Sequence, residues 1–476
     1  MIVSENGLDF KRLEEEIFTF FCQQACSFLK TLLEKWDTEL MAHRDNSVYR
    51  NKGKKKTVIK TKMGEVEYKR TVYSTENAEG IKYCVYLLDE ALGLNSIGFI
   101  SPLLSEQIVQ ACCGSSYREA ARVVSELTGQ TISHTTAWDV VQKVGNQIDE
   151  HEQQAAKQAT KNQGIGTLEV TVLFEEQDGI ILNLQGESRK KNGSRKEMKL
   201  AIAYSGAEKK GKNRYELTNK VACASFEGIG DFVKRKEGVI GSVYNIDEIE
   251  VRLLGGDGAN WVRRSQTDET VYFQLDPFHR NKAVLELASD PDARKAIINF
   301  LYHKEIDLKD IDLLIDVIEV LAQSSQDIKE QDNYLELHKY FQNNRDGLVP
   351  YQRRGLEIPK PPDDKVYRRL GTVESNIFTI IGNRMKGRRA CWSINGGGNM
   401  ARILCLKFTN RLSDTLQKLT SFTLPERYAE EIPVQLSAAK VRLSAGKGYD
   451  GFKKMSIPSS LPWMKNIAAM RPFSEL

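Results

Sequence analysis

Six short β-type segments fall between residues 168 and 276, and this series limits the fold more than any other feature of the chain. The segments are rich in aliphatic and β-branched residues and are separated by basic loops, as expected of sheet strands. Over residues 279–345 the aliphatic side chains recur at helical spacing instead. Strands followed by a helical block predict an α/β domain that carries an all-helical insertion. The six segments are LEVTVLF, GIILNLQG, EMKLAIAYSG, KVACASF, EVRLLGG and VYFQLD.

The residues ahead of this series form three smaller regions. Apolar side chains at roughly helical spacing over 8–36 predict an amphipathic helix or a pair of helices. TVIKTKMGEVEYKRTVY, residues 57–73, alternates apolar with basic or polar residues around Met-Gly-Glu, which predicts a β-hairpin with one basic face. Over 104–147 a helical pattern breaks at TGQT and resumes after Ser133, a favourable N-cap. The two interpretations are a helix-turn-helix and an ordinary packing of three helices.

The predicted fold class is therefore α/β, preceded by a mainly helical region with a basic β-hairpin. We expect six segments in chain order: an N-terminal helical region (1–45), the basic β-hairpin region (46–100), a helix-turn-helix-like domain with a polar linker (101–160), the first part of the core (161–278), the helical insertion (279–362), and the second part of the core with a C-terminal tail (363–476).

Charge is nearly balanced overall but uneven along the chain. The net charge is +4, yet residues 50–70 carry nine Lys or Arg against two Glu, and residues 188–215 carry ten against two. Such blocks suit a polyanion, because each cation placed on a phosphate releases counterions; the alternative is a solvated basic face. With no window of about 18 uninterrupted apolar residues and a polar N-terminus, the sequence favours a cytosolic protein. The eight cysteines form no CxxC pair, which argues against disulfides and structural zinc.

One acid shares a helical stripe with core-type residues. In GTVESNIFTIIGNRMKGRRACWS, residues 371–393, a helix beginning at Thr372 places Glu374 on the stripe that also holds Ile377, Phe378, Ile381 and Met385. The opposite stripe is polar, so an inward acid needs a reason. A basic run follows, consisting of Arg384, Lys386, Arg388 and Arg389.

Two further acids lie near the ends of predicted strands. Asp178 lies in FEEQDGIIL, and Asp257 follows EVRLLGG among glycines that would let a substrate or metal approach closely. Functional groups collect at strand ends in α/β sheets, so three carboxylates from separate parts of the chain are a candidate site for two divalent ions about 4 Å apart. Glu175 and Glu176 are rivals of Asp178 as ligands, and both Asp-Gly pairs are also typical of turns.

The motifs around these acids resemble those of a known family. GEVEYKRTVY, YREAARVVSELTG, the first Asp-Gly, GGDGANW, LDPFHRNKAV and the block at 371–393 together resemble the DDE transposases of bacterial insertion sequences, specifically the ISLre-type family, which is related to the Mutator-like transposases. The resemblance covers nearly the whole chain. It implies a ribonuclease-H-like catalytic core with a helical insertion between the second Asp and the Glu, in agreement with the 117-residue interval from 257 to 374.

The functional residues of that family carry over one by one. Asp178, Asp257 and Glu374 take the places of the three catalytic, metal-binding acids, which implies two Mg²⁺ or Mn²⁺ ions as cofactors. His279 takes the place of a His that contacts the DNA near the scissile phosphate or orders the site, with a buried structural His as the alternative. Asp276 would then be a further ligand or a helix cap.

The resemblance implies a transposase that binds double-stranded DNA, both the terminal inverted repeats of its element and the target, as a homodimer or larger assembly without a membrane partner. It would cut at the element end and join the freed 3′-hydroxyl to target DNA, in the cytoplasm at the nucleoid. The alternatives are a ribonuclease-H-like nuclease or resolvase without strand transfer and a non-catalytic DNA-binding protein. Trp392 would stack on a base or pack in the core. The expected DNA contacts are Lys54, Lys55, Lys56, Lys60, Lys62, Thr135, Thr136, Gln142, Lys143, Arg384, Lys386, Arg388, Arg389 and Trp392.

Overall fold

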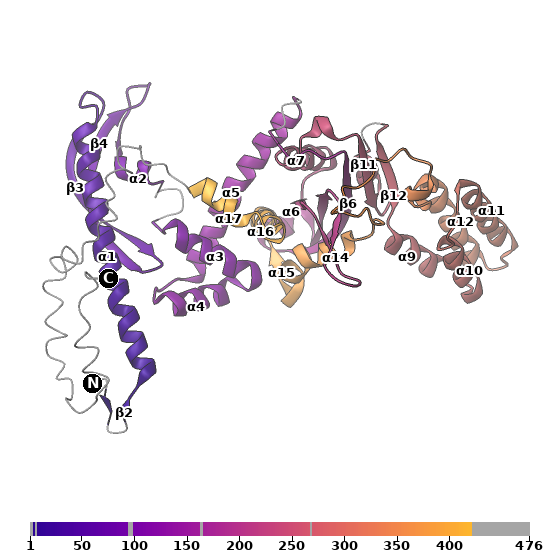
Figure 1. Ribbon diagram of the computed structural model, residues 1–476, viewed down its shortest axis with the longest axis horizontal. Coiled ribbons are helices and arrows are strands. Elements are labelled where there is room, and N and C mark those ends of the chain that lie inside the picture. Colours follow the sequence, from indigo (N-terminus) through magenta and orange to yellow (C-terminus); the bar gives the residue numbers. More distant parts are fainter. Residues whose placement is uncertain (1–2, 5–6, 94–98, 162–164, 267–268, 421–476) are drawn as a thin grey trace. The chain divides into compact units, whose positions relative to one another are not determined.

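The chain divides into two compact units, which Figure 1 shows in a computed structural model that describes residues 3–4, 7–93, 99–161, 165–266 and 269–420. Unit 1 contains Met1–Leu104 and Ser125–Thr131, and unit 2 contains Ser105–Val124 and Ile132–Leu419. The helix that follows Ser133 thus groups with the later part of the chain, whereas the sequence analysis placed a boundary at residue 160.

Unit 1 is built from a long helix and a three-stranded antiparallel sheet. Helix α1 (Phe10–His43) packs on β4 (Gly64–Glu76), which pairs with β3 (Arg50–Thr61) and β5 (Lys82–Val85). The predicted hairpin is confirmed, and the N-terminal pattern forms one helix and not two. The shared core consists of Leu33, Ile59, Val66, Tyr68 and Leu88. The other elements are β1 (Val3–Ser4), β2 (Gly7–Leu8) and α2 (Leu87–Ala91).

Three helices follow in the chain: α3 (Pro102–Gly114), α4 (Tyr117–Thr128) and α5 (His134–Ala159). Ser133 caps α5 by accepting the N–H of Thr136 at 2.9 Å, and Gly129 takes a φ of 65° in the preceding turn. The predicted order of helix, glycine turn and capped helix is therefore present. The buried face of α5 packs on α7 (Ile229–Gly241) and α16 (Ile394–Phe408), which makes α5 part of the core of unit 2.

Unit 2 is organised around one mixed sheet with the strand order β10-β7-β6-β11-β12. Strand β7 runs antiparallel to both β6 and β10, whereas β11 and β12 run parallel to β6. The carboxyl ends of β6, β11 and β12 therefore point to the same edge of the sheet. This mixed sheet with its helices confirms the α/β class. The strands are β6 (Val172–Leu184), β7 (Arg195–Tyr204), β10 (Val221–Ser225), β11 (Val251–Gly256), β12 (Val271–Leu275) and β13 (Cys391–Trp392), which adds to the end of β6.

The first two predicted strands are one continuous strand. β6 runs straight through Asp178 and Gly179, which lie opposite Leu200 and Lys199 of β7. The alternative prediction of a turn at this Asp-Gly pair is therefore wrong. Pairing with β7 along the strand, and with β11 over its first half, outweighs the local preference of Asp-Gly for a turn.

A helical block lies between β12 and the helix of Glu374, as predicted. Each of its four longer helices begins at an aspartate N-cap: Asp276, Asp290, Asp307 and Asp327. In Figure 1 these helices extend from the β12 side of the sheet, and their apolar faces share one core with it. The helices are α9 (Pro277–Leu287), α10 (Pro291–Leu301), α11 (Leu308–Ser324), α12 (Ile328–Asn343) and α13 (Arg345–Leu348).

The helix of Glu374 is irregular. It begins as α14 (Val373–Ile377), continues as a π-helical turn (Phe378–Gly382) and ends as α15 (Asn383–Met385). The wider turn shifts the helical phase, so Ile380 is buried while Phe378 is 61% exposed. The predicted stripe is therefore wrong at Phe378, and Glu374 itself is exposed and not inward.

The remaining elements of unit 2 are short. They are α6 (Gly186–Asn192), β8 (Ala207–Lys209), β9 (Tyr215–Leu217), α8 (Asn260–Arg263), α17 (Leu412–Thr420), and single turns of 3₁₀ helix at Ile246–Glu248, Tyr351–Arg353 and Gly387–Arg389. None of the described helices combines the length and the apolar character that crossing a bilayer requires.

Candidate active site

Three predicted site residues converge where β11 and β12 end, beside the middle of β6. Asp178 of β6, His279 of α9 and Glu374 of α14 each offer one ligand atom, and these atoms lie within 4.8 Å of one another. The Nε2 atom of His279 is 3.8 Å from Oδ1 of Asp178. Asp178 is buried and Glu374 is exposed, so the cluster is open to solvent on the side of α14.

Asp257 comes alongside this cluster through the register of the sheet. Gly256 of β11 pairs with Gln177 of β6, so the next residue of each strand is an aspartate, Asp257 beside Asp178. Oδ1 of Asp257 accepts the N–H of Ala259 at 2.9 Å, which orders the loop. The atoms within 4.8 Å of one another do not include those of Asp257, so it is a neighbour of the tight group.

The helical insertion supports the Asp257 loop. Tyr340 of α12 donates its hydroxyl to the carbonyl oxygen of Asp257 at 2.9 Å. Gly258 adopts a φ of 82°, and a Cβ there would lie 2.4 Å from the side chain of Asn344. The loop therefore needs a glycine at this position, and the insertion holds it from the other side.

The acids of the site are poorly neutralised. Burial raises the pKa of Asp178 to about 7, and the charges of Asp257 and Glu374 act in the same direction, against the imidazole of His279 and the N–H of Gly179. Burial opposes the charged form of His279, but its hydrogen bond with Asp276 and the charge of Asp178 outweigh that effect and raise its pKa. Several carboxylates thus face a single imidazole.

Asp276 acts as a cap and an orienting group. Its Oδ2 accepts the backbone N–H of His279 at 3.1 Å and lies 3.1 Å from the Nδ1 atom of the same residue. When Nδ1 carries the proton of that hydrogen bond, Nε2 faces Asp178 with its lone pair. Of the two roles expected for Asp276, the structure supports the cap.

The rival acids of β6 have other partners. Glu175 pairs with Lys236 at 2.6 Å and with Arg252 at 3.2 Å. Glu176 accepts five hydrogen bonds of 2.6 to 3.0 Å, from the N–H groups of Gly371, Thr372 and Val373, from the hydroxyl of Thr372 and from that of Tyr204. Because side chains alternate along a strand, Glu176 shares the face of Asp178, and Glu175 lies on the opposite face.

Glu176 therefore fixes the start of the helix that carries Glu374. Its carboxylate holds the backbone at 371–373, one residue before Glu374. From the sequence we expected Glu176 to be a rival ligand, and its capping role was not predicted. The available signal was its spacing of two from Asp178 within a buried strand.

The predicted DNA contacts in the basic hairpin are mostly exposed. Lys54, Lys55, Lys56 and Lys62 are exposed, and Lys60 is half-buried. Three of these cations have partners: Lys54 lies 3.2 Å from Asp37, Lys56 lies 2.9 Å from Glu67, and Lys60 lies 3.3 Å from Glu65 and donates to the carbonyl of Thr131. The hairpin is a basic surface whose charge is partly offset within unit 1.

The predicted contacts on α5 divide into two kinds. Thr135 and Lys143 are exposed, and Thr136 is half-buried with its hydroxyl 2.8 Å from that of Ser133. Gln142 is used internally, because its side-chain oxygen accepts a hydrogen bond from Asn399 of α16 at 2.9 Å. Gln142 is therefore placed to hold α5 against α16.

The end of the Glu374 block is more buried than predicted. Trp392 is 6% exposed and donates its indole N–H to the carbonyl of Met385, so the core alternative for Trp392 is correct and base stacking is not. Arg384 is half-buried, donates to the carbonyl of Cys112 at 2.7 Å and lies over the ring of Trp392, so it is not a surface phosphate contact. Lys386 and Arg389 are exposed. The side chain of Arg388 lies outside the described part of the structure.

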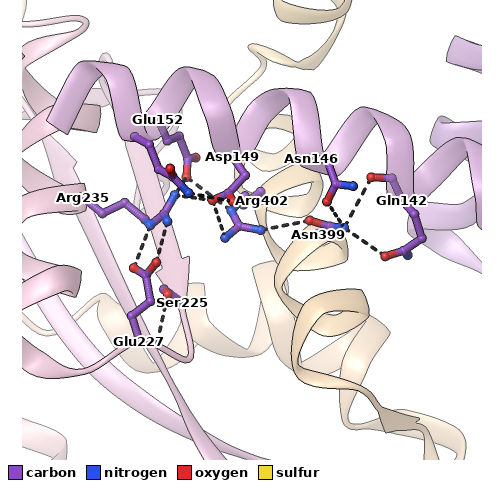
Figure 2. Close-up of polar contacts among 10 residues, drawn as sticks. Gln142, Asn146, Asp149, Glu152, Ser225, Glu227, Arg235, Asn399 and Arg402 are labelled. Atoms are coloured by element: carbon purple, nitrogen blue, oxygen red, sulfur yellow. Dashed lines mark hydrogen bonds and ion pairs between the residues drawn. The ribbon is translucent and has the colours of Figure 1, made fainter. Parts of the chain in front are cut away.

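A second group of acids in unit 2 is fully engaged by arginines (Figure 2). Arg235 of α7 lies 2.8 Å from Asp149, 2.9 Å from Glu152 and 2.6 Å from Glu227. Arg402 of α16 lies 2.7 Å from Asp149 and 3.6 Å from Glu152. Burial raises the pKa of Glu152, whereas the hydrogen bonds from Arg235 lower that of Glu227. This network joins α5, α7 and α16.

The comparisons with known proteins identify relatives without a described activity. The model of UPF0236, described as an uncharacterised protein family, matches residues 3–415. A UPF0236 protein in the vanSb 3′ region of Streptococcus gallolyticus is 23% identical over 402 residues, which is 82% of this chain and 81% of that protein. A UPF0236 protein of Caldanaerobacter subterraneus subsp. tengcongensis is 24% identical over 407 residues, 84% of this chain and 78% of its own, and its name joins eleven loci of that genome.

Proposed function

The chain belongs to the UPF0236 family, and from its site we propose that it is a metal-dependent transposase of the DDE type. It would bind the ends of a mobile element, hydrolyse a phosphodiester bond there and join the freed 3′-hydroxyl to target DNA. The observation that carries this proposal is the convergence of Asp178, His279 and Glu374, with Asp257 beside them, on one edge of the sheet.

The strand order supports a ribonuclease-H-like core within the α/β class. Strands β6, β7 and β10 form an antiparallel meander, and β11 and β12 continue the sheet in parallel on the other side of β6. The first two acids then sit on the adjacent central strands, and the third follows from a helix after the insertion. This is the arrangement that the resemblance to DDE transposases implies, so fold and site support the same proposal.

The donor set fits a hard divalent cation. Carboxylate oxygens are the ligands that Mg²⁺ and Mn²⁺ prefer, and the buried Asp178 faces two other acids with only the imidazole of His279 to offset their charge. Asp178, Asp257 and Glu374 would hold the ions, with His279 as a neighbouring nitrogen donor. When bound, such ions supply charge stabilisation to the phosphoryl oxygens of an in-line displacement.

The residues around the acids position the groups that act on DNA. Glu176 fixes the first turn of α14 and hence Glu374, and Asp276 directs Nε2 of His279 toward the site. His279 could then accept or return a proton close to the phosphate. The exposed Lys386 and Arg389 would hold phosphates of the strand that leaves the site.

The names of two relatives support the proposal that proteins of this family are encoded by mobile elements. One UPF0236 protein of Caldanaerobacter carries eleven loci in its name, and a second carries four. Repeated loci are expected of a gene that is copied with a mobile element. For this chain, inverted repeats on either side of its gene would be the corresponding sign.

The test is cleavage of labelled duplexes that carry the DNA flanking the gene, with Mg²⁺ or Mn²⁺. We expect the native protein to cut at the element end and to join the product to target DNA. Asp257→Asn should abolish both reactions, and Asp247→Asn, at an exposed acid away from the site, should abolish neither. Cutting that persists in Asp257→Asn contradicts the proposal. Cutting without joining favours a nuclease, and binding without cutting favours a DNA-binding protein.

A further inference from the structure

A cavity of unit 2 lies beside α14 and has a mainly cationic lining. Its volume is about 560 Å³, and residues of β9, the start of β10, α14 and the end of α16 contribute to it. Three cationic side chains line it, Lys220, Arg368 and Arg411, against one carboxylate, the exposed Glu216. The volume lies within the range of small-ligand sites, and the charge selects an anion.

The cations of this cavity have no acidic partner in the described part of the chain. Lys220 is half-buried and donates to the side-chain oxygen of Asn376 at 3.0 Å, a neutral group. Burial lowers the pKa of both Lys220 and Arg411, and it outweighs the opposing charges of acids beyond ion-pair distance, Glu216 for Lys220 and Glu152 and Asp414 for Arg411. In the same unit the buried Arg235, by contrast, is paired with Glu152 and Glu227. An anionic ligand would supply the missing partner.

Aromatic surface lies next to these charges. Tyr215 and Phe408 line the cavity, and the guanidinium of Arg368 lies over the ring of Tyr215 at 4.1 Å from its centroid. Arg368 thus covers one face of the Tyr215 ring. A planar base can stack on the outer face of such a pair, next to cations that can hold its phosphate. A sugar phosphate that lacks a base would leave this surface unused.

We propose that the cavity formed by Lys220, Arg411 and Tyr215 binds one nucleotide, with its phosphate on the two cations and its base on the aromatic surface. The nucleotide is either free or one residue of a single DNA strand, which share this chemistry. The inference goes beyond the proposed strand cleavage and does not depend on it. Because Asn376 of α14 contacts Lys220, the occupied cavity would also brace the helix that carries Glu374.

The test is calorimetric titration of the full chain in EDTA, with dAMP, inorganic phosphate and a 5′-phosphorylated oligothymidylate of eight residues as three separate probes. We expect saturable binding of one dAMP per chain, at least about tenfold tighter than phosphate because of stacking. Tighter binding of the oligonucleotide than of dAMP would assign the site to a DNA strand, and the reverse would assign it to a free nucleotide.

Two variants locate the binding. Lys220→Met and Arg411→Met should each weaken the binding of dAMP at least about tenfold. The thermal midpoint should stay the same or rise, since a half-buried cation without an ion pair is removed. Lys212→Met, at an exposed lysine outside the cavity, should change nothing. Absence of dAMP binding, equal affinity for phosphate, or affinity that survives both cavity variants overturns the inference. Asp257→Asn should bind dAMP normally, so failure of cleavage and failure of this site are separable.

Discussion

Two groups of acids in unit 2 differ in what balances their charge. In the Figure 2 network, Asp149, Glu152 and Glu227 are bound directly by Arg235 and Arg402. At the sheet edge, Asp178, Asp257 and Glu374 face one imidazole, and the group is open on the side of Glu374.

The difference indicates which acids need a ligand to balance their negative charge. Buried carboxylates with arginine partners are complete and can serve to join helices. Carboxylates that crowd together without a cation destabilise the folded chain unless a ligand compensates them. On this ground we interpret the first group as structural and propose the second as a site for cations.

The largest expected effect is the loss of Arg235. Arg235→Ala removes the guanidinium that three acids share and leaves Glu152 buried without its closest partner, so the free energy of unfolding should fall by about 3–5 kcal/mol. Urea unfolding measures this. Arg189→Ala, at an exposed arginine, is the control and should change stability little. An unchanged unfolding curve for Arg235→Ala would mean that the network does not hold α5 and α7 together.

The opposite pattern is expected at the sheet edge. Asp178→Asn removes a carboxylate from an acid-rich group, so stability should be kept or should rise, whereas DNA cleavage should fall by about 100-fold or more. Cleavage kinetics and thermal unfolding of the same sample separate the two effects. A loss of stability as large as that of Arg235→Ala would show that Asp178 is structural, and the comparison would fail.

A substitution of Glu176 tests whether this acid of β6 has a structural role while Asp178, on the same strand, has a catalytic one. Glu176→Gln replaces a carboxylate that accepts five hydrogen bonds, so stability should fall by about 2 kcal/mol. Cleavage should fall about tenfold, because the start of α14 would no longer be fixed. Thermal unfolding and cleavage rates measure the two effects, with the exposed Glu187→Gln as the control. Full cleavage activity of Glu176→Gln would show that the cap is not needed to position Glu374.

The smallest effect is a pH dependence in the arginine network. The hydrogen bonds from Arg235 lower the pKa of Glu227 below its value of about 4.3 in an unfolded chain. Its contribution to stability is therefore complete above that value and is lost as the pH falls through the folded pKa. Thermal midpoints measured between pH 6 and pH 3 should decline less steeply in Glu227→Gln than in the native protein. Parallel curves would count against the ion pair.

Much of the fold could be predicted from the sequence, but the difference between the arginine-bound acids and the acids of the candidate site could not. Periodicity located the strands and the helical block, because burial of one face leaves a regular pattern. It failed at Asp178-Gly179, where pairing with β7 overrides a turn signal, and at Phe378, where a π-helical turn changes the phase.

The site residues, too, could be predicted from the sequence only in part. Motifs singled out Asp178, His279 and Glu374, which do converge. They could not show that Glu176 caps α14 or that Arg384 donates to the carbonyl of Cys112, because those partners lie far away in the chain. Nor could they show that Asp149 and Glu152 meet two arginines from other helices.

The most direct test of the proposed cation site is a titration with Mn²⁺, in which electron paramagnetic resonance measures the free ion. The native chain should bind two Mn²⁺ ions, Asp178→Asn should bind them at least about tenfold more weakly, and Glu227→Gln should bind them as the native chain does. Equal binding by the native chain and Asp178→Asn would contradict the claim that the acids at the sheet edge form a cation site.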